Sequence, residues 1–369
     1  MGRKSLWLGL VLALLATACR SRASTDPLRS GRQHVEASRC AGVDRYAQAI
    51  ADLKTALAAE PERLEAYYWL YVAHSESGDA EGATRALTDL EEAVAAGRGG
   101  PEGRFWLFKT CAEKGDEAAR DQALAALETA VYSTPDDADA HFWLGRAYYE
   151  VEQHDQALQS LQNAVTMNPE HALAHFWMGQ IYAEQGRLDL ALQEFNTVLR
   201  INPENVAAYH NRGVVAYQMG NLEQASSDTQ VALEHDPDDP RSHYQLGAIY
   251  LTQALPDTPV GLPNTGLLDK AQSEFETALE LCPGMLEPLI GLGNLHLIQG
   301  NPAAALEALH QALEQTPDSQ QAWFALARAH AALGKSEAAC EALARFLSLS
   351  PPLEWGEQAE QMRAQLGCR

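Results

Sequence analysis

Large apolar and small residues recur among polar ones in a pattern that repeats about every 34 residues along this chain. Within one repeat they stand three, four or seven residues apart in two consecutive runs. Starting from Ala138, the first run has Leu144, Gly145 and Tyr148, and the second has Ala157, Leu161 and Ala164. Such spacing places side chains on one face of an α-helix. The pattern therefore predicts two amphipathic helices in each repeat.

Prolines mark the ends of the repeats. They stand at Pro135, Pro169, Pro203 and Pro237, and, after one insertion, at Pro283, Pro317 and Pro351. Proline lacks the backbone N–H that a helix interior needs, and it disfavours helical geometry in the residue before it. We therefore expect each proline to end the second helix of its repeat.

Two small residues in each repeat have a predicted packing role. Numbered from the first residue of a repeat, a glycine stands at position 8 and an alanine at position 20, as in Gly179 with Ala191 and Gly247 with Ala271. Without bulky side chains there, the two helices of a pair can approach closely. Larger apolar residues then fill the space between neighbouring pairs.

These positions match the pattern L-G-x2-Y, A-x3-F, A and P, and the chain resembles the tetratricopeptide repeat family. The resemblance implies an all-α fold, a right-handed superhelical solenoid of helix-turn-helix repeats, because one repeat cannot bury its apolar face alone. The expected repeat starts lie near Leu64, Arg104, Ala138, Ala172, Val206, Pro240, Leu286 and Gln320.

The outer parts of the array depart from the pattern. Residues 43–103 are predicted to be degenerate repeats, the earliest of which keeps Ala49, Leu53 and Pro61 but has no evident first helix. Residues 104–353 form the regular array. Residues 354–369 are expected to be a capping helix, with an amphipathic pattern from Leu353 to Leu366 that covers the last apolar face.

Two insertions interrupt the period. Twelve extra residues at about 254–266 contain Pro256, Pro259 and Pro263 and are either a docking loop or neutral variation. Six extra residues fall near Ala95 to Gly103 and either bend the superhelix between an amino-terminal pair and the regular array or are neutral variation.

The amino terminus has the features of an export signal. Two basic residues precede an apolar run from Leu6 to Leu15, and small residues lead to Cys19. Residues 1–18 are therefore predicted to be a signal peptide. The segment before Cys19 resembles the bacterial lipobox, although Ala16 stands where leucine is usual. This resemblance implies that Cys19 is acylated and anchored in the lipid bilayer. A plain cleaved signal, which would leave a soluble periplasmic protein, is the alternative.

Residues 19–42 are predicted to be the lipidated cysteine followed by a flexible basic tether, because residues 1–39 carry seven basic and two acidic side chains. Such a segment would lie beside anionic lipid. Arg20 follows the cysteine, and in this respect the chain resembles lipoproteins that are sorted to the outer membrane. This resemblance implies a protein that faces the periplasm. The simpler interpretation is a spacer without a specific lipid site.

The formal net charge of −23 argues against a nucleic-acid partner, since neutralising phosphates requires an excess of lysine and arginine. Among the cysteines, Cys111 stands at position 8 of its predicted repeat and is expected to be a small buried residue. A bond between Cys340 and Cys368 is possible if the capping helix folds back on the last repeat.

The sequence contains no evident catalytic motif, metal site or cofactor site. It lacks a Gly-rich phosphate loop, H-E-x-x-H and G-x-S-x-G. His171 and His175 have a spacing that can bind metal on a helix. However, His141, His175 and His243 all occupy position 4, where the family often has tryptophan, so His175 is interpreted as a packing residue.

In the tetratricopeptide family, the first helices line the concave surface, and position 5 usually faces a ligand. The predicted partner-binding residues at this position are Tyr68, Phe142, Phe176, His210, Tyr244, Ile290 and Phe324. If they are exposed, they suit a peptide with apolar anchors, and the acidic charge favours basic residues around those anchors. The alternative is that these rings pack against the next helix.

The combined features resemble bacterial envelope lipoproteins with tetratricopeptide repeats. Some of these assist assembly of pilus secretins, and others hold peptidoglycan hydrolases near their substrate. We therefore expect a membrane-anchored, non-enzymatic scaffold that binds an envelope protein or peptide. Two alternatives stay open: an enzyme or ligand-binding protein that uses the 254–266 loop, and a structural protein that associates with itself.

Overall fold

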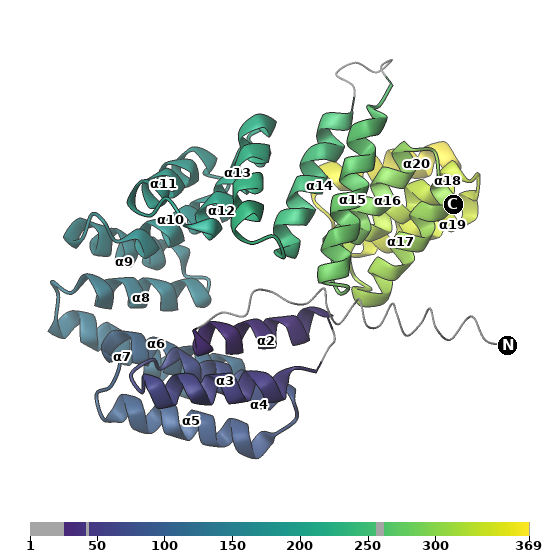
Figure 1. The fold of residues 1–369 in the computed structure, drawn as a ribbon. Coiled ribbons are helices and arrows are strands. Elements are labelled where there is room, and N and C mark those ends of the chain that lie inside the picture. The colour runs from purple at the N-terminus through teal and green to yellow at the C-terminus, as the bar shows by residue number, and fades with distance from the viewer. Residues whose placement is uncertain (1–25, 42–43, 256–261, 369) are drawn as a thin grey trace. The chain divides into compact units, whose positions relative to one another are not determined.

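The structure is a computed structural model that describes residues 26–41, 44–255 and 262–368 (Figure 1). These residues form nineteen α-helices, α2 to α20, and no strand. The prediction of an all-α fold built from consecutive helix pairs is confirmed. None of the described helices combines the length and the apolarity needed to cross a bilayer. The predicted signal peptide and Cys19 lie outside the described residues.

Two compact units divide the chain, unit 1 (Met1–Ala232) and unit 2 (Leu233–Arg369). In unit 1 each first helix packs on its partner and on the next first helix. The helices of this unit are α2 (Pro27–Ala41), α3 (Tyr46–Ala59), α4 (Glu65–Glu76), α5 (Ala80–Ala95), α6 (Gly100–Lys114), α7 (Glu117–Ser133), α8 (Ala138–Glu150), α9 (His154–Met167), α10 (Ala172–Glu184), α11 (Leu188–Ile201) and α12 (Val206–Gln218). Helix α13 (Leu222–His235) crosses the division.

Unit 2 consists of three further helix pairs and a last single helix. They are α14 (Pro240–Ala254), α15 (Thr265–Leu281), α16 (Leu286–Ile298), α17 (Pro302–Gln315), α18 (Gln320–Ala332), α19 (Ser336–Ser348) and α20 (Leu353–Leu366). The first helices again pack on one another, α14 on α16 and α16 on α18.

Six of the eight predicted repeat starts coincide with the first residue of a helix, namely those of α8, α10, α12, α14, α16 and α18. Polar caps explain several of them. The side chains of Asp137, Asn205 and Asp239 accept hydrogen bonds from backbone N–H groups of the first turns of α8, α12 and α14. These N–H groups have no partner within the helix, so the cap sets where it begins.

The predicted start at Arg104 is wrong, because α6 begins earlier, at Gly100. Trp106 donates to the Glu102 carboxylate at 3.2 Å, as Trp69 of α4 donates to Glu65 at 3.0 Å. Trp106 therefore takes the place of Trp69, and the register is three residues earlier than predicted. Position 8 of this repeat is Phe108 rather than Cys111, although Cys111 is buried as expected.

The predicted flexible tether is also wrong over residues 27–41, which form helix α2 packed on α3. Leu28 and Val35 are buried on one side of this helix. A β-carbon on Gly31 would lie 3.1 Å from the carbonyl oxygen of Ala49, the same close approach that Gly145 makes to Ala157. Helix α2 is therefore the first helix of the earliest repeat, which the sequence pattern does not reveal.

The predicted close approach at position 8 is confirmed in both units. A β-carbon on Gly145 would lie 2.8 Å from Cγ of Leu161, and one on Gly247 would lie 2.7 Å from the Phe275 ring. Glycine at this position lets the side chain of the second helix rest directly on the backbone of the first.

The 12-residue insertion lies in the turn between α14 and α15, and these two helices are longer than the corresponding helices of a regular repeat, at 15 and 17 residues. The backbone N–H of Asn264 donates to the carbonyl of Ala254 at 2.8 Å, which closes the base of the connection. Residues 256–261 lie outside the described part, and a docking role for them stays a prediction.

The last helix, α20, has the predicted bounds, Leu353–Leu366. Ala359 is buried, and the Trp355 ring lies near Phe324, with centroids 6.1 Å apart. Cys340 on α19 and Cys368 after α20 form a disulfide, with their Cα atoms 5.5 Å apart. The capping helix is thus covalently tied to the last repeat.

Candidate functional site

Two of the predicted partner-binding rings belong to the core of unit 1. Tyr68 is 4% exposed and Phe142 is 2% exposed. Their ring edges are covered by the tryptophan that follows each of them, at centroid distances of 5.1 Å and 4.8 Å. The prediction of an exposed ladder is wrong for these two residues, because their rings fill the space between neighbouring helix pairs.

The other five predicted residues are half-buried, and a role in binding stays a prediction for them. Phe176 lies edge-on to Phe195, with centroids 5.7 Å apart. Phe324 packs near Phe346 at 5.1 Å. The remaining three are His210, Tyr244 and Ile290.

A row of four tryptophans, one position further along each helix, faces a common surface of unit 1. The row consists of Trp69 on α4, Trp106 on α6, Trp143 on α8 and Trp177 on α10. Each follows an aromatic residue at position 5 and meets its ring at an angle of 64° to 80°. Trp69 and Trp106 are mostly buried, whereas Trp143 and Trp177 are half-buried.

Charged residues surround this row. The tryptophan stands at position 6 of each helix, and charged residues recur at positions 2, 9 and 13. These positions are four, three and four residues apart, so their side chains lie on one stripe of the helix. We call this surface the tryptophan face. It comprises the four tryptophans together with eight carboxylates (Glu36, Glu65, Glu76, Glu102, Glu113, Asp139, Glu150 and Glu184) and four cations (Arg32, Arg39, Lys109 and Arg146).

The carboxylates at position 2 hold the indole rings. The Nε1 atoms of Trp69 and Trp106 donate to Glu65 and Glu102. Burial raises the pKa of Glu102, and the negative charges of Glu65 and Asp139 raise it further. Three neighbouring first helices, α4, α6 and α8, therefore each place a carboxylate of this face near their amino-terminal end.

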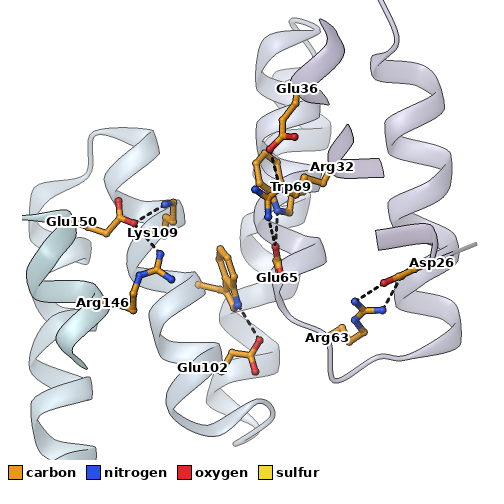
Figure 2. Close-up of polar contacts among 11 residues, drawn as sticks. Asp26, Arg32, Glu36, Arg63, Glu65, Trp69, Glu102, Lys109, Arg146 and Glu150 are labelled. Atoms are coloured by element: carbon orange, nitrogen blue, oxygen red, sulfur yellow. Dashed lines mark hydrogen bonds and ion pairs between the residues drawn. The ribbon is translucent and has the colours of Figure 1, made fainter. Parts of the chain in front are cut away.

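Arginines of this face lie over aromatic rings and between carboxylates. The Arg32 guanidinium lies 5.3 Å from the centre of the Trp69 ring, and its nitrogens are 2.9 Å from Glu36 and 4.0 Å from Glu65 (Figure 2). Arg32 comes from α2, which lies within the residues predicted to be a flexible tether.

Arg146 is the most buried cation of the face. Its guanidinium lies 3.6 Å from the centre of the Trp177 ring and 4.9 Å from that of Phe105. Burial lowers the pKa of Arg146 to about 10, despite the nearby Glu150 carboxylate. Glu150 also accepts from Lys109 at 2.8 Å and from Arg146 at 3.4 Å, as Figure 2 shows.

Position 13 carries a glutamate on five successive first helices, α2, α4, α6, α8 and α10. They are Glu36, Glu76, Glu113, Glu150 and Glu184. Glu36 and Glu113 have side chains that are 49% and 42% exposed. The eight carboxylates of the face exceed its four cations, so the face is negatively charged overall.

The tryptophan row had a signal in the sequence. An aromatic residue directly followed by tryptophan occurs at residues 68–69, 105–106, 142–143 and 176–177. Position 5 alone does not reveal the row, because the predicted register of α6 is three residues late.

The histidines at position 4 contact the carbonyl oxygen of the preceding proline. His141, His175 and His243 each place Nε2 within 3.1 Å of the carbonyl oxygen of the proline six residues earlier. Trp323, at the same position, donates Nε1 to the carbonyl of Pro317 at 2.8 Å. The interpretation of His175 as a structural residue therefore fits its contacts. Within the described residues, no group of three or more potential ligands could hold a metal ion.

Two of these histidines also contact a carboxylate. His175 Nδ1 lies 2.6 Å from Glu194, and this hydrogen bond raises the pKa of His175. Burial alone lowers the pKa of His243, but hydrogen bonds to Glu274 and to the Pro237 carbonyl outweigh it, so the net change is upward. Both ring nitrogens have an acceptor, which favours the imidazolium form.

We expect the stability contributed by His175 to fall as the pH rises. A raised pKa in the folded state means that this contribution is fully present below about pH 6.5, the unfolded value, and is lost as the pH rises through the folded pKa. Urea unfolding between mildly acidic and mildly alkaline pH measures this change. His175→Gln should flatten the profile, whereas His235→Gln on α13 should leave it unchanged. Parallel profiles for all three proteins would contradict the expectation.

The fold and the face define a class of protein, a helical repeat protein with an aromatic and charged face along successive first helices. Two family models described as tetratricopeptide repeat match residues 116–154, 144–206 and 290–354, and residues 178–244. Together these matches cover more than half of the chain. The chain belongs to the tetratricopeptide repeat family.

Solved structures of the same fold cover most of the chain. The Cut9–Hcn1 hetero-tetramer of the APC/C matches with a TM-score of 0.62 and 18% identity, over 97% of this chain and 59% of that chain. A tetratricopeptide repeat protein from Parabacteroides merdae matches with a TM-score of 0.56 and 18% identity, over 71% and 98%. PilW, described as a widely conserved type IV pilus biogenesis factor, matches with a TM-score of 0.50 and 19% identity, over 60% and 96%. No curated protein sequence matches the chain significantly.

Proposed function

We propose that this protein is a membrane-anchored scaffold of the bacterial envelope that holds a protein partner on the tryptophan face. The tryptophan face is the observation that carries the proposal. It combines half-buried aromatic rings with exposed carboxylates, and such a combination provides both apolar anchors and charge-based specificity. Proteins of this family are typically scaffolds without enzymatic activity, and the similar solved structures share the fold of this chain.

Two features support a location outside the cytoplasm. The amino-terminal residues have the pattern of a signal followed by Cys19, which in a lipoprotein would carry the acyl anchor. The disulfide between Cys340 and Cys368 is of a kind that persists in oxidising compartments and is rare in the cytosol of most organisms. We propose the periplasmic side of the outer membrane, consistent with Arg20 after the cysteine.

Site-specific photocrosslinking in envelope membranes tests this proposal. A photoreactive amino acid at Glu36 or at Glu113 should capture the same partner, because both side chains are exposed on the tryptophan face. The same substitution at Glu91, which is exposed on the second helix α5 and is not part of the tryptophan face, is the matched control and should capture at least tenfold less. Equal capture from all three positions would contradict a role of this face.

The anchor is tested separately with Cys19→Ala. The unaltered protein should sediment with membranes, because the acyl chains on Cys19 supply the membrane affinity. The variant lacks these chains and should appear in the soluble periplasmic fraction. A variant that still sediments would contradict anchoring through Cys19.

A further inference from the structure

The tryptophan face already binds cationic side chains of the protein itself. Arg32 lies over the Trp69 ring between Glu36 and Glu65. Arg146 lies over the Trp177 ring beside Glu150. The same recognition is thus made more than once: an aromatic ring beneath the cation and a glutamate at position 13 beside it.

The pattern also contains rings and carboxylates that have no such internal cation. Arg32 and Arg146 each stand at position 9 of the first helix before the tryptophan that they cover. On α4 this position is Val72, and among the described contacts no cationic side chain lies over Trp106 of the next first helix. In the described part of the chain, the half-buried Trp143 has aromatic neighbours but no cationic side chain over its ring. Asp139, whose side chain is 77% exposed, contacts only His171 among the described ion pairs.

The spacing of the carboxylates indicates which kind of protein segment could bind along them. The position-13 glutamates stand on five first helices, and neighbouring first helices pack directly on one another. Packed helices lie about 8–10 Å apart. A polyproline II segment rises about 3.1 Å per residue with three residues per turn, so every third side chain points the same way at intervals of about 9 Å.

We propose that the tryptophan face binds an extended protein segment that carries lysine or arginine at every third position. This inference rests on the proposed scaffold function. Basic side chains of the partner meet the glutamates at position 13 and the carboxylates at position 2, and the chain between them lies along Trp143 and Trp177. Charge complementarity identifies the partner, because eight carboxylates face four cations on this surface. A strand would turn alternate basic side chains away from the face, since its side chains alternate in direction.

A defined peptide tests the inference with the full-length protein. The probe is a fluorescently labelled peptide of five Pro-Pro-Lys repeats, whose lysines recur along one side of the polyproline II helix. Its binding is followed by fluorescence anisotropy. A peptide of the same composition with all lysines at one end should bind at least tenfold more weakly, and a Pro-Pro-Glu peptide should not bind. Equal affinity for the two lysine peptides would overturn the proposed spacing.

Two double variants identify the surface. Glu36→Gln with Glu113→Gln removes two exposed carboxylates of the face and should weaken binding of the Pro-Pro-Lys peptide at least tenfold. Glu91→Gln with Glu92→Gln makes the same change of charge on α5 and should alter binding less than twofold. Circular dichroism checks that both variants are folded. The same loss in both variants would show nonspecific attraction to an acidic protein and would overturn the inference.

The crosslinking experiment separates this inference from the proposed function. If the partner captured from Glu113 crosslinks through a segment without basic residues, the inference fails and the scaffold function stands. A second copy of this chain as the captured partner would overturn the basic-peptide inference in favour of self-association. If the peptide binds to the face but no envelope partner crosslinks there, the inference stands and the proposed function fails.

Discussion

Replacing Phe195 with alanine is expected to lower the free energy of unfolding of unit 1 by about 3–5 kcal/mol. The Phe195 ring is fully buried, and it rests on the backbone of the first helix of its own repeat, where a β-carbon on Gly179 would lie 2.9 Å away. It also meets the edge of the Phe176 ring. Alanine would leave a cavity that the glycine opposite cannot fill.

Urea unfolding followed by circular dichroism measures this loss. Leu173→Ala on α10 is the matched control, because Leu173 is 52% exposed and its removal should change stability by less than about 0.5 kcal/mol. Comparable losses in the two variants would mean that the core between α10 and α11 is not packed as described.

Replacing Arg146 with alanine is expected to destabilise unit 1 by about 3 kcal/mol. The guanidinium lies between the rings of Phe105 and Trp177, and its removal leaves both rings and the Glu150 carboxylate without their shared partner. Since these groups belong to three successive first helices, the change should loosen the tryptophan face across α6, α8 and α10.

The control for this variant is Arg187→Ala. Arg187 also lies over a ring, 4.5 Å from the centre of Tyr182, but it is exposed, so its loss should cost less than about 1 kcal/mol. The two variants are compared by thermal unfolding. An Arg146→Ala protein as stable as Arg187→Ala would show that the buried sandwich does not stabilise the unit.

Much of the architecture could be predicted from local sequence features. The starts of α8, α10 and α12 were predicted to the residue, because glycine, proline and capping side chains act on the backbone next to them. The bounds of α20 followed from its amphipathic pattern in the same way. The close approach at Gly145 could be predicted as well, since glycine at this fixed position of the repeat removes the side chain that would hold the two helices apart.

Helix α2 was missed because 18 residues separate Gly31 from Ala49, instead of the 12 between Gly145 and Ala157. The longer turn moved the first helix out of the expected frame, and its basic residues suggested a tether. The start of α6 was misplaced for a related reason. The six extra residues of this repeat are divided between the turn before α6 and the pair formed by α6 and α7.

The sequence by itself determined the family, the periodic helices and the close contacts within each helix pair, because these depend on side chains a few residues apart and on the backbone rules for glycine and proline. Only the tertiary structure decided which rings are buried, since the exposure of Phe142 or Trp143 depends on the neighbouring helix pairs. It also decided that Arg32, Glu65 and Trp69 meet across two helices, and that Cys340 lies within bonding distance of Cys368. Such contacts join residues far apart in the chain, and no local pattern specifies the distance between them.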